Sequence, residues 1–312
     1  MRANMFDEQA NLAYIRSQTE HVEAEAYAVQ YPDIVYPELV PIDFSAPDFA
    51  TAVTYVTTDA AGQAKWINGG AQDIPLVGLS RSESKNPVYS AAIGYDYTWE
   101  EIGQARMLGV PVTSDKAMAG RRIAEEMCER VTIEGDTTKN FQGLINNSSV
   151  TAVQAAAGVS TSRAWSAKTP LEILKDVNAA LTGVWTGSKT VEMADTILLP
   201  MDQLALIAGT PMSVDNNKTV LAMVRETNIY TQMTNRPITI RGLLQLDGAG
   251  SGGGDRMIAY RRDKNILRAH IPMPHQFLPV QQFILQYIVP GVMRLGGTDV
   301  RRPGAMRYVD DI

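Results

Sequence analysis

The sequence predicts an α+β protein, and three observations lead to this fold class. Residues 51–58 form a run rich in β-branched side chains, followed by turn-forming residues, which is typical of a β-hairpin. Residues 114–134 carry apolar side chains at helical spacing, over about 30 Å of expected helix. Between residues 170 and 289 short apolar strands alternate with helices, which is typical of an α/β or α+β domain.

The composition is that of a globular protein. Its 312 residues are 45% hydrophobic and 20% charged, which is enough apolar mass for one large domain or two moderate ones. No run approaches the ~18 apolar residues of a membrane span, and the first eight residues lack a signal-peptide core. We therefore expect a soluble intracellular protein with no membrane partner. Cys128 is the only cysteine, which excludes an intrachain disulfide and a thiolate metal cluster.

Charge is distributed unevenly along the chain. The net charge of −6 argues against a nucleic-acid binder with a dominant basic surface. Residues 1–50 hold nine acidic and two basic residues, whereas residues 256–307 hold nine basic and two acidic ones. The two ends can attract each other, within one subunit or between neighbours. The alternative is two solvated surfaces with no special pairing, because exposed ion pairs are individually weak.

The first 45 residues predict an arm. Residues 7–28 carry a narrow apolar stripe at helical spacing, so this helix needs a surface to lie on. Prolines at 32, 37 and 41 then favour an extended chain and no continuing helix. Such a segment runs over the surface of its own domain or of a neighbouring subunit.

A long hairpin is expected over residues 51–87, because the pieces at 65–70 and 74–79 are broken by glycine and proline and do not suit a central sheet. The pattern of residues 88–97 predicts a strand that returns to the body of the domain. Thr98 and Glu101 have the spacing of a capping box, which starts a short helix that ends by Leu108.

The helix at 114–134 is expected to be the backbone of the first domain. Its apolar row is Gly120, Ile123, Ala124, Met127 and Val131. Its charged residues alternate in sign at i, i+4 spacing: Arg121, Arg122, Glu125, Glu126, Glu129 and Arg130. Gly135 then ends the helix.

The second domain begins near residues 140–150. A second capping box at Thr169–Glu172 starts a helix. The pattern further predicts strands at 196–200, 238–240, 243–246 and 257–260, helices at 201–208 and 219–226, and one long final strand at 281–289 followed by a basic tail.

The sequence predicts no catalytic, cofactor-binding or metal site, and therefore a protein that is not an enzyme. Residues 248–253 match G-x-G-x-x-G, but a strand follows them, so no helix N-terminus is offered to a phosphate. His270 and His275 lie five apart among prolines, which is not a metal-binding spacing. Cys128 lies beside the apolar row of a helix, where a buried, unreactive thiol is expected.

The order of these parts resembles the major capsid proteins of tailed phages, whose fold is named after phage Hong Kong 97. The passages that carry the resemblance are 94–102, 133–136, 143–146, 255–260 and 300–303. The resemblance implies an α+β Hong Kong 97-like capsid fold. Its parts would be an N-terminal arm (1–45), a P domain (46–140) with the hairpin (51–87) and a spine helix (114–134), an α/β A domain (141–279), and a closing segment (280–312) that completes the P domain.

The resemblance also implies a function and partners. Copies would assemble as hexamers and pentamers into the icosahedral shell of a phage head, which encloses double-stranded DNA and contacts it without sequence preference. The protein would be located in the virion after assembly in the host cytoplasm. Scaffold, portal or decoration proteins are further partners of this class. About 45 residues before the hairpin are too few for a built-in scaffolding segment, so a separate scaffold or none is expected.

Subunit contacts are expected at nine residues: Lys65, Trp66, Arg121, Arg122, Glu126, Arg294, Arg301, Arg302 and Arg307. Lys65 lies where some relatives carry a cross-linking lysine, but no matching asparagine partner is found, so an ordinary hairpin charge is expected. The basic C-terminal residues could instead face packaged DNA; subunit contacts are the preferred interpretation. Reversing the charges of Arg301 and Arg302 is then expected to impair assembly before it impairs folding.

Two other functions are compatible with the sequence. An encapsulin-like nanocompartment shell has the same fold and encloses enzymes in place of a genome. A soluble two-domain enzyme would need a pocket between its domains with convergent polar groups, and the sequence offers no motif for one.

Overall fold

The computed structural model describes residues 32–66, 76–108, 112–213 and 216–312. Contacts divide the chain into Met1–Asp33 and Ile34–Ile312, and the described helices and strands all belong to the second unit. The helix expected at 7–28 and residues 67–75 of the expected hairpin lie outside the described residues. No helix in the described part is long and apolar enough to cross a membrane.

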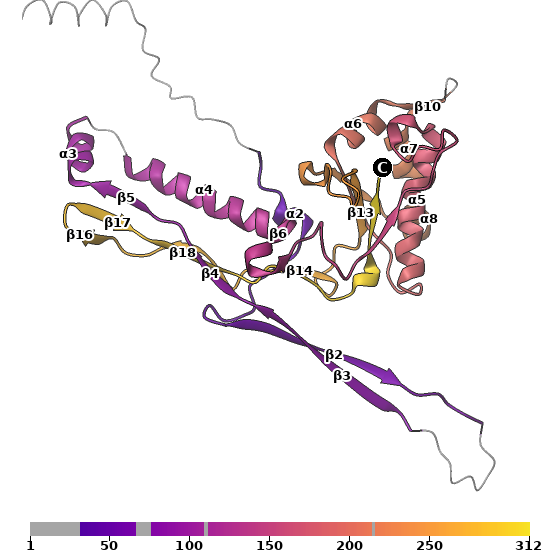
Figure 1. The fold of residues 1–312 in the computed structure, drawn as a ribbon, viewed down its shortest axis with the longest axis horizontal. Coiled ribbons are helices and arrows are strands. Elements are labelled where there is room, and N and C mark those ends of the chain that lie inside the picture. Colours follow the sequence, from indigo (N-terminus) through magenta and orange to yellow (C-terminus); the bar gives the residue numbers. More distant parts are fainter. Residues whose placement is uncertain (1–31, 67–75, 109–111, 214–215) are drawn as a thin grey trace, which may run out of the picture. The chain divides into compact units, whose positions relative to one another are not determined.

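A five-stranded sheet forms the centre of the second half of the chain (Figure 1). Its strands, in spatial order, are β12 (Thr239–Gly242), β9 (Thr196–Leu199), β13 (Arg256–Tyr260), β20 (Met306–Asp310) and β8 (Thr151–Gln154). β12 is parallel to β9, and β8 is parallel to β20, whereas β13 is antiparallel to both of its neighbours. The expected strands at 196–200, 238–240 and 257–260 are therefore present.

Both faces of this sheet are buried, and they belong to two different cores. Along β13, Met257 and Ala259 join one core, whereas Ile258 and Tyr260 join the other, as alternation along a strand requires. The first core lies under the helices of the second half: α5 (Pro170–Gly187), α6 (Met201–Gly209), α7 (Val220–Thr227) and α8 (Ile229–Thr234). The second core includes Leu39 of α2 (Tyr36–Leu39) and Val131 of α4 (Val112–Ile133).

The strand β20 differs from the expected arrangement. The closing segment 280–312 was expected to complete the first domain. Instead, residues 306–310 pair with β13 from Arg256↔Asp310 to Tyr260↔Met306, inside the sheet of the second half. The strand is buried at four of its five positions, so the chain end is part of a core rather than a basic surface tail.

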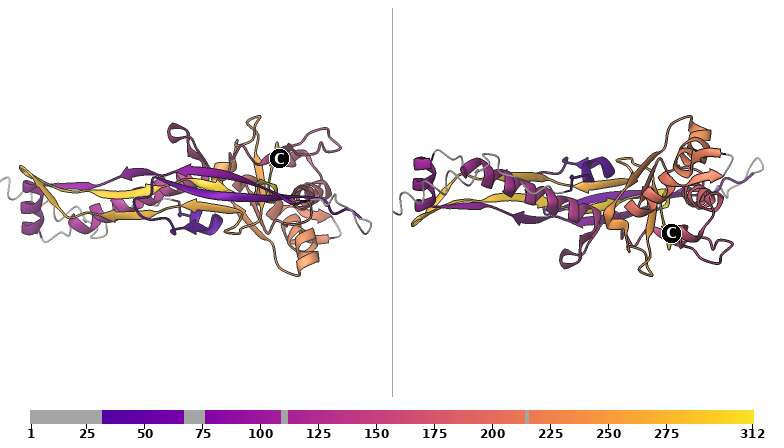
Figure 2. Two further views of the ribbon diagram at one scale, coloured as in Figure 1. Left: turned by 90° about the horizontal axis from the view of Figure 1, so that it is seen from below. Right: turned by 90° about the horizontal axis from the view of Figure 1, so that it is seen from above.

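The long helix α4 (Val112–Ile133) is present at the place expected for a helix over 114–134. Views along two directions show it beside β4 (Tyr89–Ala92) and β18 (Gly291–Leu295), and contacts join it to β15 (Met273–Phe277) and β18 (Figure 2). Ile123 is a correction to the expected apolar row, since half of its side chain is exposed. Cys128, not placed in that row, is buried with Ala124. Gly135 ends the helix with a φ of +79°, which favours glycine.

Two three-stranded sheets lie alongside this helix. One has the order β15-β18-β4, and the other β16 (Gln281–Phe283), β17 (Gln286–Val289) and β5 (Tyr95–Thr98). The single strand expected over 281–289 is thus a tight hairpin, which turns at Ile284 with a φ of +54°. The helix α3 (Trp99–Leu108) begins with the expected capping box, because Glu101 N–H donates to Thr98 Oγ1 and Thr98 N–H donates to a Glu101 carboxylate oxygen.

The hairpin expected over 51–87 is formed by β2 (Ala52–Ala61) and β3 (Gly78–Pro87). The two strands lie side by side along their length (Figure 1). Ten residue pairs keep one register from Ala52↔Pro87 to Ala61↔Gly78. Residues 56–66 and 76–85 are exposed throughout. Residues of this two-stranded ribbon therefore have no core of their own, and such a ribbon is marginally stable by itself.

The prolines at 32, 37 and 41 suggested an extended chain, but the segment 34–50 is not extended throughout. Residues 36–39 form the short helix α2, in which Pro37 lies in the first turn, where its missing N–H is not needed. The helix docks on α4, because the Tyr36 hydroxyl donates to Glu125 at 2.9 Å. The strand β1 (Ile42–Asp43) then pairs in parallel with β14 (Leu267–His270), which also pairs with β19 (Thr298–Val300).

One ion pair within the chain joins the acidic start to the basic stretch. Asp43, from the acidic start, accepts from Arg268 Nη1 at 2.9 Å. Glu38 pairs with Arg241, which lies outside the basic stretch 256–307. The pairs join the early segment to the second half of the chain.

Short elements complete the fold: β6 (Gly135–Asp136), β7 (Phe141–Gln142), β10 (Pro211–Ser213) and β11 (Asn216–Thr219). The strand expected at 243–246 is instead a 3₁₀ turn over Leu244–Leu246. The second capping box is confirmed at the start of α5, with both reciprocal bonds between Thr169 and Glu172.

Candidate subunit interface

The exposed part of the β2–β3 hairpin carries apolar side chains. Trp66 is fully exposed, and Val56 and Leu79 show 58% and 64% of their surface. Lys65, predicted to make a subunit contact, lies next to Trp66 and is also exposed. Large apolar side chains on an exposed strand pair are typical of a surface that another chain covers.

The base of the hairpin is attached to the C-terminal part of the chain by Arg301. Its guanidinium lies 4.6 Å from the centre of the Tyr55 ring, and its Nε donates to Asp299 Oδ2 at 3.0 Å. Burial raises the pKa of Asp299, but the neighbouring His270 and Arg301 outweigh it and leave the pKa below its usual range. Arg301 was predicted to contact another subunit. In the structure it contacts Tyr55 and Asp299 of its own chain.

The other three C-terminal arginines also make contacts within the chain. Arg294 is buried and donates to the Asp48 carbonyl at 2.9 Å, and Arg307 donates to the Gly183 carbonyl at 3.2 Å. Arg302 pairs with Glu192 at 2.8 Å while more than half of its side chain stays exposed. Of these three, Arg302 has the most surface left for another subunit.

The exposed face of α4 holds the remaining predicted contacts. Arg122 Nε lies 3.0 Å from Glu126, an i, i+4 pair that the charge pattern predicted, and Arg121 is exposed one residue earlier. Beside this face a groove of about 330 Å³ is lined by apolar side chains of α4, β4 and β18 and by Glu126 and Arg130. Arg121, Arg122 and Glu126 therefore lie on one helix, α4, whereas Lys65 and Trp66 belong to the hairpin segment.

A further exposed apolar group was not predicted. Phe283, Ile284 and Leu285 at the β16–β17 turn are exposed, and so is Trp99 at the start of α3. The backbone N–H of Trp99 donates to the Leu285 carbonyl at 2.9 Å, which brings the start of α3 and the β16–β17 turn together. The turn was not predicted because residues 281–289 contain neither glycine nor proline.

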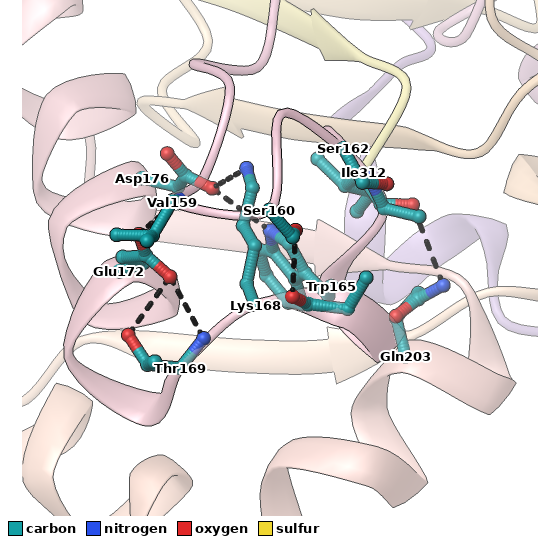
Figure 3. Close-up of polar contacts among 12 residues, drawn as sticks. Val159, Ser160, Ser162, Trp165, Lys168, Thr169, Glu172, Asp176, Gln203 and Ile312 are labelled. Carbon is teal, nitrogen blue, oxygen red and sulfur yellow. Dashed lines mark hydrogen bonds and ion pairs between the residues drawn. The ribbon is translucent and has the colours of Figure 1, made fainter.

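A buried ion pair organises the loop before α5 (Figure 3). Lys168 Nζ lies 2.5 Å from Asp176 Oδ2, and the Trp165 indole N–H donates to the same oxygen at 3.1 Å. Both charged side chains are almost fully buried. Glu172 accepts from the Val159 N–H at 2.8 Å as well as from Thr169, so the loop is held from two sides. These contacts position the loop against the helix, and nothing in them requires a ligand.

Replacing Asp176 by asparagine is expected to lower the free energy of unfolding by about 2–3 kcal/mol, because Lys168 loses its counter-charge in a buried site. The double variant Lys168→Met/Asp176→Leu removes both charges and is expected to recover part of that loss. Urea unfolding of the two variants and the parent checks this. A single variant as stable as the parent would show that the ion pair does not stabilise the fold.

The structure places two sequence features that were considered as chemical sites. Residues 248–254 form a loop that enters β13, so the G-x-G-x-x-G match has no following helix, as expected. Cys128 is buried, and burial raises its pKa to about 12, so this thiol is held in its unreactive form. No group of three or more His, Cys, Asp or Glu in the described part is arranged to hold a metal ion.

Solved structures with a similar fold include the capsid of a phage, another phage protein and a virus-like particle. The capsid of Myoviridae phage XM1 matches with a TM-score of 0.79 and 19% identity, over 95% of this chain and 97% of that chain. Mycobacterium phage Adephagia matches with a TM-score of 0.63 and 10% identity, over 95% and 96% of the two chains. A virus-like particle from Pyrococcus furiosus matches with a TM-score of 0.51 and 10% identity, over 88% and 91%. The fold is therefore a phage capsid-like fold of mixed helices and sheets.

The sequence itself assigns the family. Residues 62–312 match the family described as Major capsid protein, which is most of the chain. A search of the curated proteins finds no match. The chain belongs to the major capsid protein family, and it is a structural protein of the head shell.

Proposed function

We propose that copies of this chain assemble as hexamers and pentamers into an icosahedral shell that encloses double-stranded DNA, in a virion formed in the host cytoplasm. The observation that carries the proposal is the β2–β3 hairpin, whose residues 56–66 and 76–85 are all exposed. A two-stranded ribbon of this kind gains burial only from other chains. Self-association, rather than a reaction on a substrate, is accordingly the activity of this chain.

In finer detail the fold is of the Hong Kong 97 type. The N-terminal arm comprises residues 1–45. The P domain comprises residues 46–140 and most of 280–305, with α4 as its spine. The A domain comprises residues 141–279 together with β20, since that strand is hydrogen-bonded between β13 and β8. One core contains only residues of the A domain and the chain end, which supports this division, whereas the core that includes α2 and α4 joins residues of both domains.

Subunit contacts are assigned to the exposed and half-buried residues of the predicted set: Lys65, Trp66, Arg121, Arg122, Glu126 and Arg302. Arg294 holds the early segment in place, Arg301 holds the hairpin base, and Arg307 holds α5. Scaffold, portal and decoration proteins are further partners of the shell.

Electron microscopy of the purified protein, expressed alone and with its neighbouring genes, tests the proposal. Closed shells that protect DNA from nuclease are expected. Shells that contain proteins instead of DNA would favour the alternative, a nanocompartment. A stable 34.1 kDa monomer under every condition would exclude both and return a soluble enzyme to consideration.

A further inference from the structure

His270, the last residue of β14, is buried between two aspartates. Asp43 Oδ2 lies 3.5 Å from its Nδ1, and Asp299 Oδ2 lies 3.5 Å from its Nε2. The side chain is 1% exposed, and neither ring nitrogen has a hydrogen-bond partner of good geometry in the described part of the chain. The two aspartates come from β1 and β19, which flank β14 on either side.

The protonation state of the ring decides whether these contacts are attractive. A neutral imidazole has one N–H and one lone pair, so one of the two carboxylates must face a lone pair. A protonated imidazole has an N–H for each carboxylate. Both carboxylates have lowered pKa values: burial raises the pKa of Asp43, but hydrogen bonds from Ser45 and Arg268 lower it to about 2, and the neighbouring His270 and Arg301 outweigh burial and lower the pKa of Asp299.

The other charged groups around the ring complete an alternating row. Arg268 Nη1 lies 2.9 Å from Asp43, and Arg301 Nε lies 3.0 Å from Asp299. α4 and β3 contribute uncharged groups near this row. The Thr132 carbonyl of α4 accepts a hydrogen bond from the Thr298 hydroxyl, and Asn86 of β3 lies beside Asp299. With a proton on His270, positive and negative groups alternate along the whole row.

This row joins parts of the chain that are distant in sequence. Asp43 belongs to the segment that follows the arm, and Arg301 stacks on Tyr55 at the base of the hairpin. We propose that His270 is a proton-dependent fastener, which holds β1 and the hairpin base to β14 and β19 when protonated and loosens them when it loses the proton. The proposal concerns one subunit and does not depend on shell assembly.

The sign of the pH effect follows from the geometry. A carboxylate oxygen lies 3.5 Å from each ring nitrogen and attracts a protonated ring, so this attraction is present at the acid side and is lost when the ring loses its proton.

Hydrogen exchange with mass spectrometry on the full chain, at about pH 5.5 and about pH 8 and corrected for intrinsic rates, tests the proposal. In the parent protein, peptides that cover residues 42–56 and 78–88 are expected to lose at least about threefold in protection at the higher pH, whereas peptides from β9 and β13 change by less than about 1.5-fold. An equal loss in all peptides, or no loss in the first two, would overturn the proposal without any variant.

The variant His270→Gln removes the titrating ring, and its protection at 42–56 is expected to change by less than about 1.5-fold between the two pH values. The matched control is His275→Gln, on β15, whose ring lies 3.3 Å from the Ile93 carbonyl and away from this row. The control is expected to keep the full pH dependence of the parent. A His270→Gln protein that also keeps it would overturn the proposal.

Discussion

Replacing Asp310 by asparagine is expected to lower the free energy of unfolding by about 3–5 kcal/mol, because it breaks a fully buried ion pair. Arg256 makes two bonds to this carboxylate, Nε to Oδ1 at 2.6 Å and Nη2 to Oδ2 at 2.9 Å. Both side chains are more than nine-tenths buried. The carboxylate also accepts from the Ser251 N–H at 3.1 Å, so an amide cannot satisfy all three donors.

The position of this pair explains the size of the effect. Arg256 also donates to the Ile145 carbonyl at 2.6 Å, and its guanidinium lies 4.6 Å from the centre of the Tyr308 ring. Tyr308 in turn donates to the Leu144 carbonyl at 2.6 Å. A single substitution therefore loosens the pairing of β13 with β20 and the attachment of the loop after α4.

The effect of Asp310→Asn depends on pH with a predictable sign. Burial raises the pKa of Asp310, but the bonds from Arg256 and Ser251 outweigh burial and leave it lowered. A lowered carboxyl pKa contributes stability above its usual value of about 4, and that contribution is lost as the pH falls through the lowered pKa in the folded state. Urea unfolding at several pH values is expected to show a parent–variant difference that is full at neutral pH and shrinks in acid. The control Asp59→Asn, on the exposed hairpin, is expected to change stability by less than about 0.5 kcal/mol.

Shortening the hairpin is expected to abolish assembly while the subunit still folds. Residues 60–79 would be deleted and Asp59 joined to Ser80, its register partner, through an Asn-Gly turn. Tyr55 and its contact with Arg301 stay in place. The removed residues that the structure describes are exposed, so no core residue is lost.

Sedimentation velocity and thermal unfolding together check this prediction. A folded particle of subunit or capsomer size, with an unfolding temperature near that of the parent, is expected. The control Thr57→Ala removes the hydroxyl pair of Thr57 and Ser82 at 2.8 Å but keeps the hairpin at full length, and it is expected to assemble. Normal shells from the shortened chain would show that the hairpin does not hold subunits together.

Local sequence signals predicted the elements that depend on neighbouring residues. The capping boxes at Thr98 and Thr169, the hairpin and the length of α4 follow from residues close in sequence, and the structure confirms them. Predictions failed where distant contacts decide the outcome. Cys128 rather than Ile123 faces the core because of what packs on α4, with Met293 Sδ 3.9 Å from the Cys128 sulfur.

The candidate interface could be predicted only in part. Lys65 and Trp66 follow from the hairpin pattern, and Arg122 and Glu126 from their helical spacing. The β16–β17 turn could not be found, because Ile284 adopts a left-handed conformation that a β-branched residue rarely takes. Nor could charge counting show that Arg294 is buried against the Asp48 carbonyl, since that contact spans 246 residues.

A density map of the assembled particle by cryo-electron microscopy tests the central claim most directly. The account predicts a closed shell in which the exposed hairpin residues, Val56, Trp66 and Leu79 among them, are covered by a neighbouring subunit. A shell in which both faces of the hairpin remain in solvent would contradict the account.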